Sequence, residues 1–372
     1  MPAVEEKVQS KKSRKGIRIM EIIICIILVI AIVAAVFITV VTKPVDDSSD
    51  KAVAVGGMIV SDTVEYQSDS AKGLEKNPII KIMQMIWRFC CDGDMKKHAK
   101  QTPPDGIEEI YDIPYIDDGN RYHSLDVYYP ENTTDKLPVI IDIHGGGWMY
   151  AEKDLNEYYC KALADRGFIV FNISYRLVPD VTVNEQIQDV MQALKWIGEN
   201  IESYPADSSK IMLTGDSAGG QLAVYSAVLL QSEELRDIFD TVHAEIDIDA
   251  LLLTSPVAYM KDGAMSVYTK ILWGKDYKEK KTYNYMNLDE IIDYAQLPPT
   301  YLITSSGDTL AHTQTCKAAE LLKSKGVDCT LKDYEKYNGK NLVHVFSVLE
   351  PFDEIGTQTI DEAVAFYKDV IK

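Results

Sequence analysis

The segment 215–219 combines a possible nucleophile with small neighbours, because it has the sequence Gly-Asp-Ser-Ala-Gly with Ser217 at its centre. A predicted strand, Lys210 to Leu213, precedes it, and a helical pattern, Ala218 to Leu230, follows it. A serine between a strand and a helix lies on a sharp turn, which requires small neighbours and exposes the hydroxyl. We therefore expect Ser217 to be the nucleophile of an acyl-transfer reaction. The Ala218 backbone N–H is expected at the helix N-terminus, where an anion is favoured.

A glycine run, His-Gly-Gly-Gly-Trp at 144–148, follows another predicted strand at 139–143. Acyl transfer requires preorganised donors for an oxyanion, and glycines let backbone N–H groups approach a substrate closely. A phosphate-binding loop would have G-x-G-x-x-G or a following G-K-[ST], and neither pattern is present. The predicted oxyanion hole is made by the Ala218 N–H and by two N–H groups of the glycine run. The sequence does not distinguish which two of the three glycines contribute: Gly145, Gly146 and Gly147.

A serine nucleophile needs a general base, and in α/β-hydrolases the triad follows the chain order serine, acid, histidine. The histidines that follow Ser217 are His243, His312 and His344. His312 is only four residues past Asp308, too close to face that acid and also reach a serine on another strand. His344 follows the last predicted strand and precedes the closing helix. We therefore expect His344 to be the base.

The acid that orients the base is expected to be Asp308, which follows the predicted strand Tyr301 to Thr304. Catalytic loops in parallel sheets lie at the carboxyl ends of the strands. Asp333 and Glu335 remain alternatives. No C-x-x-C pair or H-E-x-x-H stretch suggests a structural metal, and the expected acyl-transfer mechanism implies no metal or organic cofactor.

Apolar strands alternate with helical patterns along the rest of the chain, which predicts a mainly parallel sheet covered by helices on both faces. The remaining predicted strands and helices are Leu155 to Ala164, Phe168 to Ile173, Ile187 to Ile201, Leu251 to Leu253, Ala318 to Leu322, Val327 to Tyr334 and Ile360 to Ile371. Residues 257–297 interrupt the alternation and contain six tyrosines, which indicates a lid or an extra helical pair. Residues 78–101 are expected to form a helix that packs on the main domain and could also form one wall of a substrate pocket.

Five segments together resemble the hormone-sensitive-lipase-like branch of α/β-hydrolase esterases, over roughly residues 105–372. They are HGGGW at 144–148, SYRLVPD at 174–180, GDSAGG at 215–220, LPPTYLITSSGDTL at 297–310 and HVF at 344–346. The resemblance implies a triad of Ser217, Asp308 and His344 and a helical cap made from the segment before the core and from 257–297. Family members often have glycine after the histidine, where this chain has Val345. Tyr175 and Arg176 are expected to shape a turn.

The N-terminal region contains an apolar run from Ile22 to Val41 in which Thr39 is the only polar residue. At about 1.5 Å per helical residue this run spans about 30 Å, the thickness of a bilayer core. It is longer than the apolar region of a cleaved signal peptide, so we expect a permanent anchor. Six cationic residues precede the run and acidic residues follow it. The charge bias predicts a cytoplasmic N-terminus and residues 43–372 outside the cytoplasm.

The formal net charge of −19 over 372 residues argues against a nucleic-acid partner. Five cysteines follow the apolar run, and their number and spacing predict no disulfide framework. His98 and His123 are expected at the surface. The predicted segments are a basic segment (1–18), a transmembrane anchor (19–41), a tether (42–77), an N-terminal cap segment (78–104) and a catalytic domain (105–372) with a cap insertion (257–297).

The sequence therefore predicts a membrane-anchored serine esterase that works through an acyl-enzyme, and the resemblance implies that its esters have small to medium acyl chains. The substrate is expected to be a small-molecule ester. Tyrosines of the insertion could stack on a sugar ring, which makes an acetylated glycan one candidate, and a lipid ester near the bilayer is another. A serine peptidase and a catalytically inactive binding domain are the alternatives. The sequence does not indicate the oligomeric state.

Overall fold

The computed structural model describes residues 67–262 and 265–372. The predicted basic segment, the transmembrane anchor and the tether up to residue 66 lie outside the described residues. Within the described ranges, no helix is both long and apolar enough to cross a membrane.

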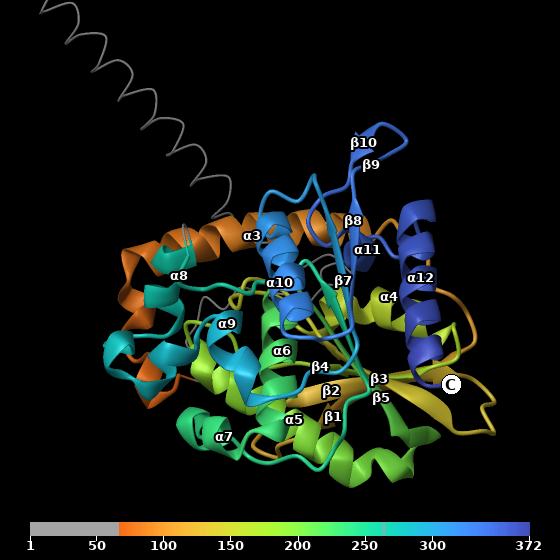
Figure 1. The fold of residues 1–372 in the computed structure, drawn as a ribbon, viewed down its shortest axis with the longest axis horizontal. Helices are drawn as coiled ribbons and strands as arrows, with labels where there is room; N and C mark the ends of the chain where they lie inside the picture. Colours follow the sequence, from red (N-terminus) through yellow and green to blue (C-terminus); the bar gives the residue numbers. More distant parts are fainter. Residues whose placement is uncertain (1–66, 263–264) are drawn as a thin grey trace, which may run out of the picture. The chain divides into compact units, whose positions relative to one another are not determined.

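The central sheet has eight strands in the order β1-β2-β4-β3-β5-β6-β7-β8 (Figure 1). The strands are β1 (Ile107–Pro114), β2 (Ser124–Pro130), β3 (Leu137–Ile143), β4 (Ile169–Ile173), β5 (Ala206–Asp216), β6 (Ala250–Thr254), β7 (Thr300–Ser305) and β8 (Cys329–Tyr334). β2 pairs antiparallel with β1 and β4, and all pairs from β4 to β8 are parallel. The predicted mainly parallel sheet is confirmed.

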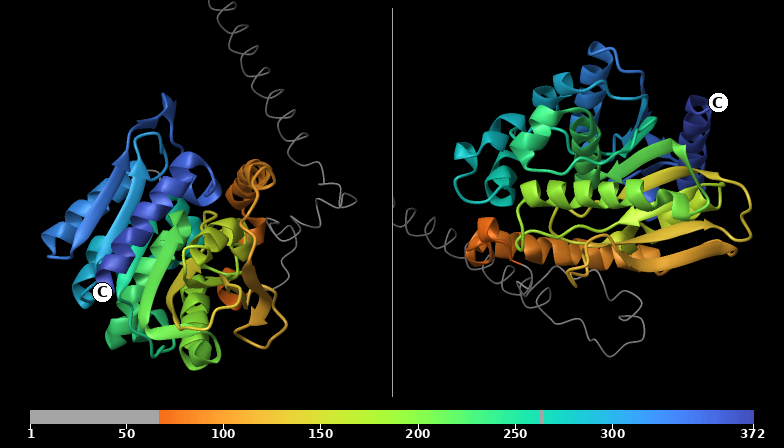
Figure 2. Two further views of the ribbon diagram at one scale, coloured as in Figure 1. Left: turned by 90° about the vertical axis from the view of Figure 1, so that its right-hand side faces the viewer. Right: turned by 90° about the horizontal axis from the view of Figure 1, so that it is seen from below.

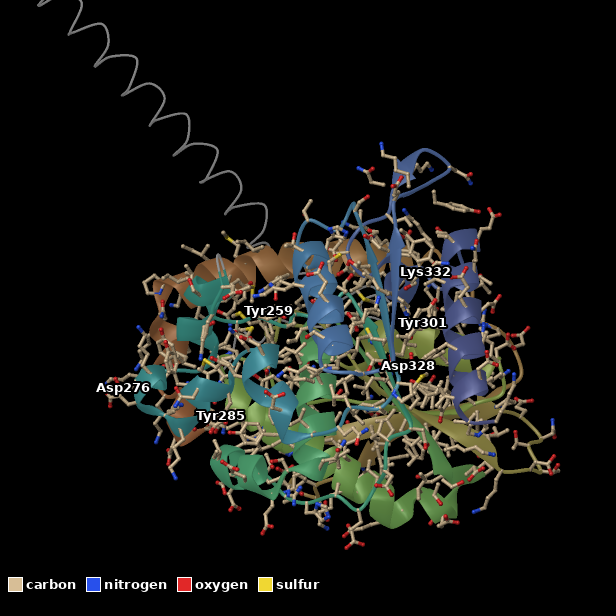
Figure 3. All side chains as sticks on the ribbon, viewed as in Figure 1. Tyr259, Asp276, Tyr285, Tyr301, Asp328 and Lys332 are labelled. Carbon is tan, nitrogen blue, oxygen red and sulfur yellow. The ribbon has the colours of Figure 1, made fainter. Side chains whose placement is uncertain are left out.

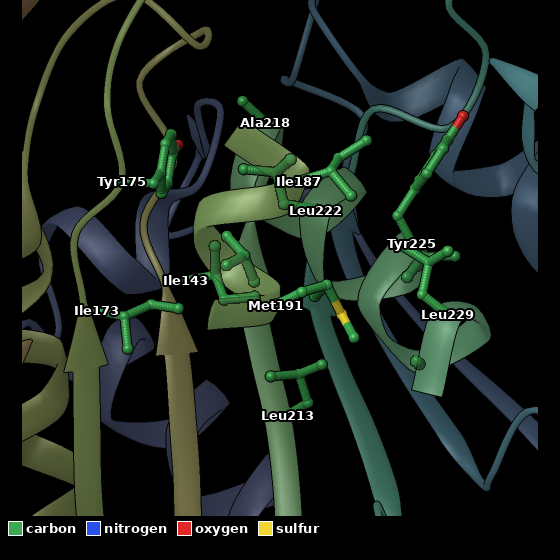
Figure 4. Close-up of a cluster of buried hydrophobic side chains, with 14 of the residues drawn as sticks. Ile143, Ile173, Tyr175, Ile187, Met191, Leu213, Ala218, Leu222, Tyr225 and Leu229 are labelled. Atoms are coloured by element: carbon green, nitrogen blue, oxygen red, sulfur yellow. The ribbon is translucent and has the colours of Figure 1, made fainter. Parts of the chain in front are cut away.

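Helices cover both faces of this sheet (Figure 2). The helices are α3 (Pro78–His98), α4 (Lys153–Ala164), α5 (Val183–Asn200), α6 (Ser217–Gln231), α7 (Glu233–Phe239), α8 (Met265–Leu272), α9 (Leu288–Ile291), α10 (His312–Ser324), α11 (Phe346–Leu349) and α12 (Glu354–Val370). Ile143 of β3 packs in one core with Ile187 of α5 and Leu222 of α6 (Figure 4). Ile140 faces the opposite core, with Leu155 of α4 and Ile360 of α12. Burial on both faces explains the continuous apolar stretches of the central strands, such as Ile211 to Leu213 in β5 and Leu251 to Leu253 in β6.

Three helices begin at least four residues earlier than their apolar patterns indicate. α5 begins at residue 183 where the pattern predicts 187, α10 begins at 312 where it predicts 318, and α12 begins at 354 where it predicts 360. The first turns of these helices are mostly polar, so hydrophobic periodicity marks only the buried part of each helix. A short hairpin, β9 (Lys336–Tyr337) and β10 (Lys340–Asn341), was not predicted.

The end of the predicted tether belongs to the folded domain. Residues 69–71 and 74–76 form two 3₁₀ turns in which Ala71 and Leu74 are buried. The Ser68 backbone N–H donates to the Asp180 carbonyl at 2.8 Å, and the Ser70 hydroxyl donates to Glu185 at 2.8 Å. The two buried apolar side chains anchor this stretch, so residues 67–77 of the predicted tether are part of the folded domain.

The α3 segment and the insertion between β6 and β7 lie side by side (Figure 1). Trp87 of α3 meets Tyr268 of α8 edge-on, with ring centroids 6.4 Å apart. Most tyrosines of the insertion pack with one another: Tyr277 with Tyr283 and Tyr285 with Tyr294, each pair T-shaped at 5.7 Å. Tyr259 is 1% exposed, and Figure 3 shows it and Tyr285 among the side chains of this region.

α6 approaches the end of β3 without room for a side chain at Gly219. A Cβ atom there would overlap the carbonyl oxygens of Ile143 and His144, both backbone atoms that cannot move independently. We predict that Gly219→Ala lowers the free energy of unfolding by about 3 kcal/mol or more, because overpacking against rigid backbone is costly. Urea unfolding followed by circular dichroism measures this change.

The matched control is Gly93→Ala in α3, where a Cβ atom would meet no described atom within 4 Å. Alanine is the better helix former, so this variant should be as stable as the wild type or up to about 1 kcal/mol more stable. Equal stability of the two variants would contradict the proposed close approach of α6 to β3.

Candidate active site

Ser217 lies where β5 ends and α6 begins, as predicted, and its backbone has a φ of +51°. A positive φ is uncommon for a residue with a side chain and persists only where the surroundings impose it. The Ser217 carbonyl accepts a hydrogen bond from the Val257 N–H at 3.0 Å, which helps to fix the turn. A Cβ atom on Gly215 would lie 2.5 Å from the Gly219 carbonyl oxygen, so the turn requires glycine there as well.

The structure brings the three predicted triad residues into one hydrogen-bonded chain. His344 Nε2 lies 2.9 Å from Ser217 Oγ, and His344 Nδ1 lies 2.9 Å from Asp308 Oδ2. The Asp308 side chain is fully buried, whereas 20% of the His344 side chain is exposed. A neutral imidazole whose Nδ1–H donates to the carboxylate presents Nε2 as an acceptor to the serine hydroxyl. This is the arrangement that a general base requires.

Asp308 is held in its ionised form. Burial raises its pKa, but the hydrogen bond and charge of His344 and the backbone N–H of Ala311 outweigh burial and lower the pKa to about 2. Its Oδ1 atom accepts the N–H groups of Leu310 and Ala311 at 2.9 and 3.0 Å. These bonds leave Oδ2 to orient the histidine.

The alternative acid Asp333 and the alternative base His312 lie within hydrogen-bond distance of each other. His312 Nε2 lies 3.0 Å from an Asp333 carboxylate oxygen. His243 is exposed, and so is Glu335. None of these residues takes part in the chain that ends at Ser217.

Gly145 differs from the other two glycines of its loop in its hydrogen bonding. The Gly145 N–H donates to Asp216 Oδ1 at 2.9 Å, so it is not available to an oxyanion. Within residues 67–262 and 265–372, the N–H groups of Gly146 and Gly147 have no hydrogen-bond acceptor, and both residues have a positive φ. Ala218 is the second residue of α6, where an N–H has no intrahelical acceptor. Gly146, Gly147 and Ala218 are therefore the available donors.

A buried pair of acids, Asp142 and Asp216, supports the glycine loop, and no local sequence pattern indicates this pair. Asn156 Nδ2 donates to Asp216 Oδ1 at 2.9 Å and to Asp142 Oδ2 at 2.8 Å. Burial raises the pKa of Asp216 to about 6, although Asn156, His344 and the Gly145 N–H oppose this change. Burial and the neighbouring Asp216 raise the pKa of Asp142 to about 8. Near pH 7 the pair therefore carries one negative charge, on Asp216.

Tyr175 was expected only to shape a turn, but it also holds the end of β3 in place. Its hydroxyl donates to the carbonyl oxygens of His144 and Gly145, at 2.8 and 3.1 Å. Its ring stacks on the His144 ring at 4.3 Å. Burial lowers the pKa of His144 to about 4, so this imidazole is neutral at pH 7. Together these contacts fix the strand end from which the glycine loop departs.

The prediction that His123 lies at the surface is wrong. Only 4% of it is exposed, and its two ring nitrogens lie 2.8 Å from Asp118 and 3.4 Å from Asp189. Asp189 also pairs with Arg176, so this histidine is a buried member of an ion-pair network. His98 is half-buried and stacks on Tyr158 at 3.6 Å.

α3 covers the glycine loop, which supports its expected role as a pocket wall. A Cβ atom on Gly147 would lie 2.5 Å from Trp87 Cζ2. Trp87 stacks on Tyr150 at 5.3 Å, and the Tyr150 hydroxyl donates to Asp94 of α3 at 3.0 Å. The indole of Trp87 therefore bounds the space next to the available N–H groups.

The raised pKa of Asp142 makes stability depend on pH. Its pKa of about 8 in the folded chain exceeds about 3.9 for an unfolded aspartate, so the folded state binds a proton that the unfolded state has lost. Stability from this group is therefore full below about pH 4 and is lost as the pH rises to about 8. We predict that the free energy of unfolding of Asp142→Asn, relative to wild type, increases over this range and then levels off. Urea unfolding across the range measures it.

The matched control is Asp165→Asn, which removes an exposed carboxylate at the end of α4. Its stability relative to wild type should show no comparable slope. A curve for Asp142→Asn parallel to the wild-type curve at all pH values would contradict the assignment of a proton to Asp142.

Comparison with known proteins agrees with this geometry. The BD-FAE family model matches residues 125–325, more than half of the chain. The chain is 28% identical to carboxylesterase NlhH of Mycobacterium tuberculosis over 252 residues, which cover 63% of this chain and 76% of that protein. It is 38% identical to arylacetamide deacetylase of Bos taurus over 121 residues, 30% of this chain and 29% of that protein. The structure of esterase B from Lactobacillus rhamnosis superposes with a TM-score of 0.74 and 28% identity, covering 79% of this chain and 97% of that one. The chain therefore belongs to the BD-FAE family of α/β-hydrolase esterases, within the hormone-sensitive-lipase-like group that its motifs indicated, and is a carboxylic-ester hydrolase.

Proposed function

We propose that this protein hydrolyses esters of small to medium acyl chains through an acyl-enzyme on Ser217. His344 is the general base and Asp308 is the acid that orients it. The observation that carries the proposal is the unbroken chain from Asp308 through His344 to Ser217, with both distances at 2.9 Å. The chain ends beside backbone N–H groups that have no acceptor among the described residues.

In the first step His344 Nε2 takes the proton of the Ser217 hydroxyl while the oxygen attacks the ester carbonyl. The carbonyl oxygen becomes negative and accepts hydrogen bonds from Gly146, Gly147 and Ala218. The imidazolium then protonates the leaving alcohol, and the acyl group stays on Ser217. Water repeats the sequence and releases the acid.

Three observations support a short acyl group. Trp87 lies directly over Gly147 and limits the space beside the oxyanion donors. Esterase B, whose structure resembles this one, has been crystallised with a C4-C4 tributyrin phosphonate. Versiconal hemiacetal acetate esterase of Dothistroma septosporum is 33% identical over 139 residues, 37% of this chain and 41% of that protein, which supports acetyl esters. An acetylated glycan has weaker support, because most tyrosines of the insertion pack with one another or in the core.

We further propose that the apolar run at 22–41 anchors the protein in a membrane, with the catalytic domain outside the cytoplasm. An apolar strip on the cap supports a position near lipid. Ile79, Ile82 and Ile86 of α3 follow the spacing of one helix face and are 46%, 53% and 45% exposed. Val267 of α8 is 53% exposed as well. Such a strip is suited to contact with lipid or with an apolar substrate.

The catalytic proposal predicts that Ser217→Ala lowers kcat for nitrophenyl acetate and butyrate by a factor on the order of 10⁶, as the loss of a triad serine does in a protease. The protein is the full-length chain in a mild detergent, assayed beside longer esters and a peptide substrate. The matched control is Ser226→Ala, which removes another buried serine hydroxyl from the same helix and should leave turnover unchanged.

Wild-type-like turnover by Ser217→Ala would overturn the assignment of the nucleophile. Hydrolysis of the peptide in preference to every ester would favour a peptidase. Complete inactivity of the wild type, without labelling of Ser217 by a fluorophosphonate, would favour a binding domain.

The orientation proposal predicts that protease added to intact cells digests the catalytic domain, because residues 43–372 lie outside the cytoplasm. A cytoplasmic protein in the same cells should remain whole, which controls for lysis. Protection of the catalytic domain in cells, followed by digestion after lysis, would reverse the orientation. Recovery of the full-length chain in the soluble fraction would contradict the anchor.

A further inference from the structure

Three side chains of the types that bind transition metals lie together outside the triad. His312 and Cys316 are one helical turn apart at the start of α10, and Asp333 lies near the end of the edge strand β8. His312 Nε2 is 3.1 and 3.0 Å from the two Asp333 carboxylate oxygens. Cys316 Sγ is 3.6 Å from the same Nε2 and 4.0 Å from Asp333 Oδ2.

These separations are those of ligands around one small ion. With metal bonds of about 2.0 Å to nitrogen, 2.1 Å to oxygen and 2.3 Å to sulfur, ligand atoms of a tetrahedral zinc site lie about 3.3–3.6 Å apart. The observed separations lie between 3.0 and 4.0 Å, so shifts of a few tenths of an ångström complete the site. We propose that His312, Cys316 and Asp333 bind one Zn²⁺ or a similar transition-metal ion.

The donor set selects the class of ion. A thiolate with an imidazole and one carboxylate suits zinc and its neighbours, whereas Mg²⁺ and Ca²⁺ prefer oxygen ligands alone. His312 and Asp333 have 30% and 39% of their side chains exposed, so an ion can enter from solvent and keep water as a fourth ligand.

Binding exchanges a proton for the metal at Cys316. Burial raises the pKa of this thiol, and the carboxylates of Asp333 and Glu320 raise it further, so the metal-free thiol keeps its proton at neutral pH. When the sulfur–metal bond forms, the S–H bond breaks and the proton passes to solvent.

The ion would join two segments that lead into the triad. A short turn, residues 309–311, joins Asp308 to the start of α10, and Asp308 Oδ1 accepts the Leu310 and Ala311 N–H groups. β8 leads through the β9–β10 hairpin to His344. The ion does not contact Ser217, so its expected role is to stabilise both loops, since a ligand that binds only the folded state stabilises it.

The test is a titration of the full-length, untagged chain with Co²⁺, which reports a thiolate ligand by charge-transfer absorption in the near ultraviolet. We expect one ion per chain, loss of this absorption in Cys316→Ser, and affinity at least about tenfold weaker in His312→Ala and Asp333→Asn. Zn²⁺ should displace Co²⁺ and raise the Tm of the wild type but not of Cys316→Ser.

The controls are His243→Ala and Cys90→Ser, which remove a histidine and a thiol elsewhere and should bind Co²⁺ as the wild type does. His312→Ala and Asp333→Asn change partly exposed side chains, so a folding defect in Cys316→Ser would not decide the outcome alone. Absence of charge transfer in the wild type, or equal affinity in all variants, which indicates an adventitious ion only, would overturn the proposal.

Discussion

The site depends on one steric constraint, the close approach of the first turn of α6 to the end of β3. Gly219 lies against the carbonyl oxygens of Ile143 and His144, and Gly215 lies against Gly219 itself. With no side chains between these backbones, the chain passes from β5 into α6 at a positive φ on Ser217. The same approach brings Asp216 within hydrogen-bond reach of Gly145. The nucleophile and the glycine loop therefore take their relative positions from one contact between backbones.

Buried carboxylates then fix the groups that act on a substrate. Asp308 is ionised because His344 and two backbone N–H groups outweigh the cost of burial. Asp216 accepts the hydrogen bond of the Gly145 N–H. This N–H lies close to the serine but is therefore not available to an oxyanion. Asp142 is kept neutral by burial and by Asp216, which avoids two adjacent buried charges. Each acid has a different state because its surroundings differ, although all three are aspartates.

The sequence predicted the triad and the parallel sheet because both have local signals. Ser217 lies in a strand–turn–helix pattern, and Asp308 and His344 follow apolar strands in the expected order. The hydrogen bond from the Gly145 N–H to Asp216 could not be predicted, because Asp216 lies 71 positions away along the chain. Asn156, Tyr175 and Trp87 support the loop through similarly long-range contacts. The predicted surface position of His123 failed because its partners, Asp118 and Asp189, are brought together only by the fold.

We propose that Ser217 carries the acyl group between the two halves of the reaction. Rapid acid quenching of the enzyme during hydrolysis of nitrophenyl butyrate, followed by mass spectrometry of its peptides, tests this role. We expect a butyryl group on Ser217, present within the first turnover and lost as the acid is released. Turnover with no acyl group on Ser217, or with the group on another residue, would contradict it.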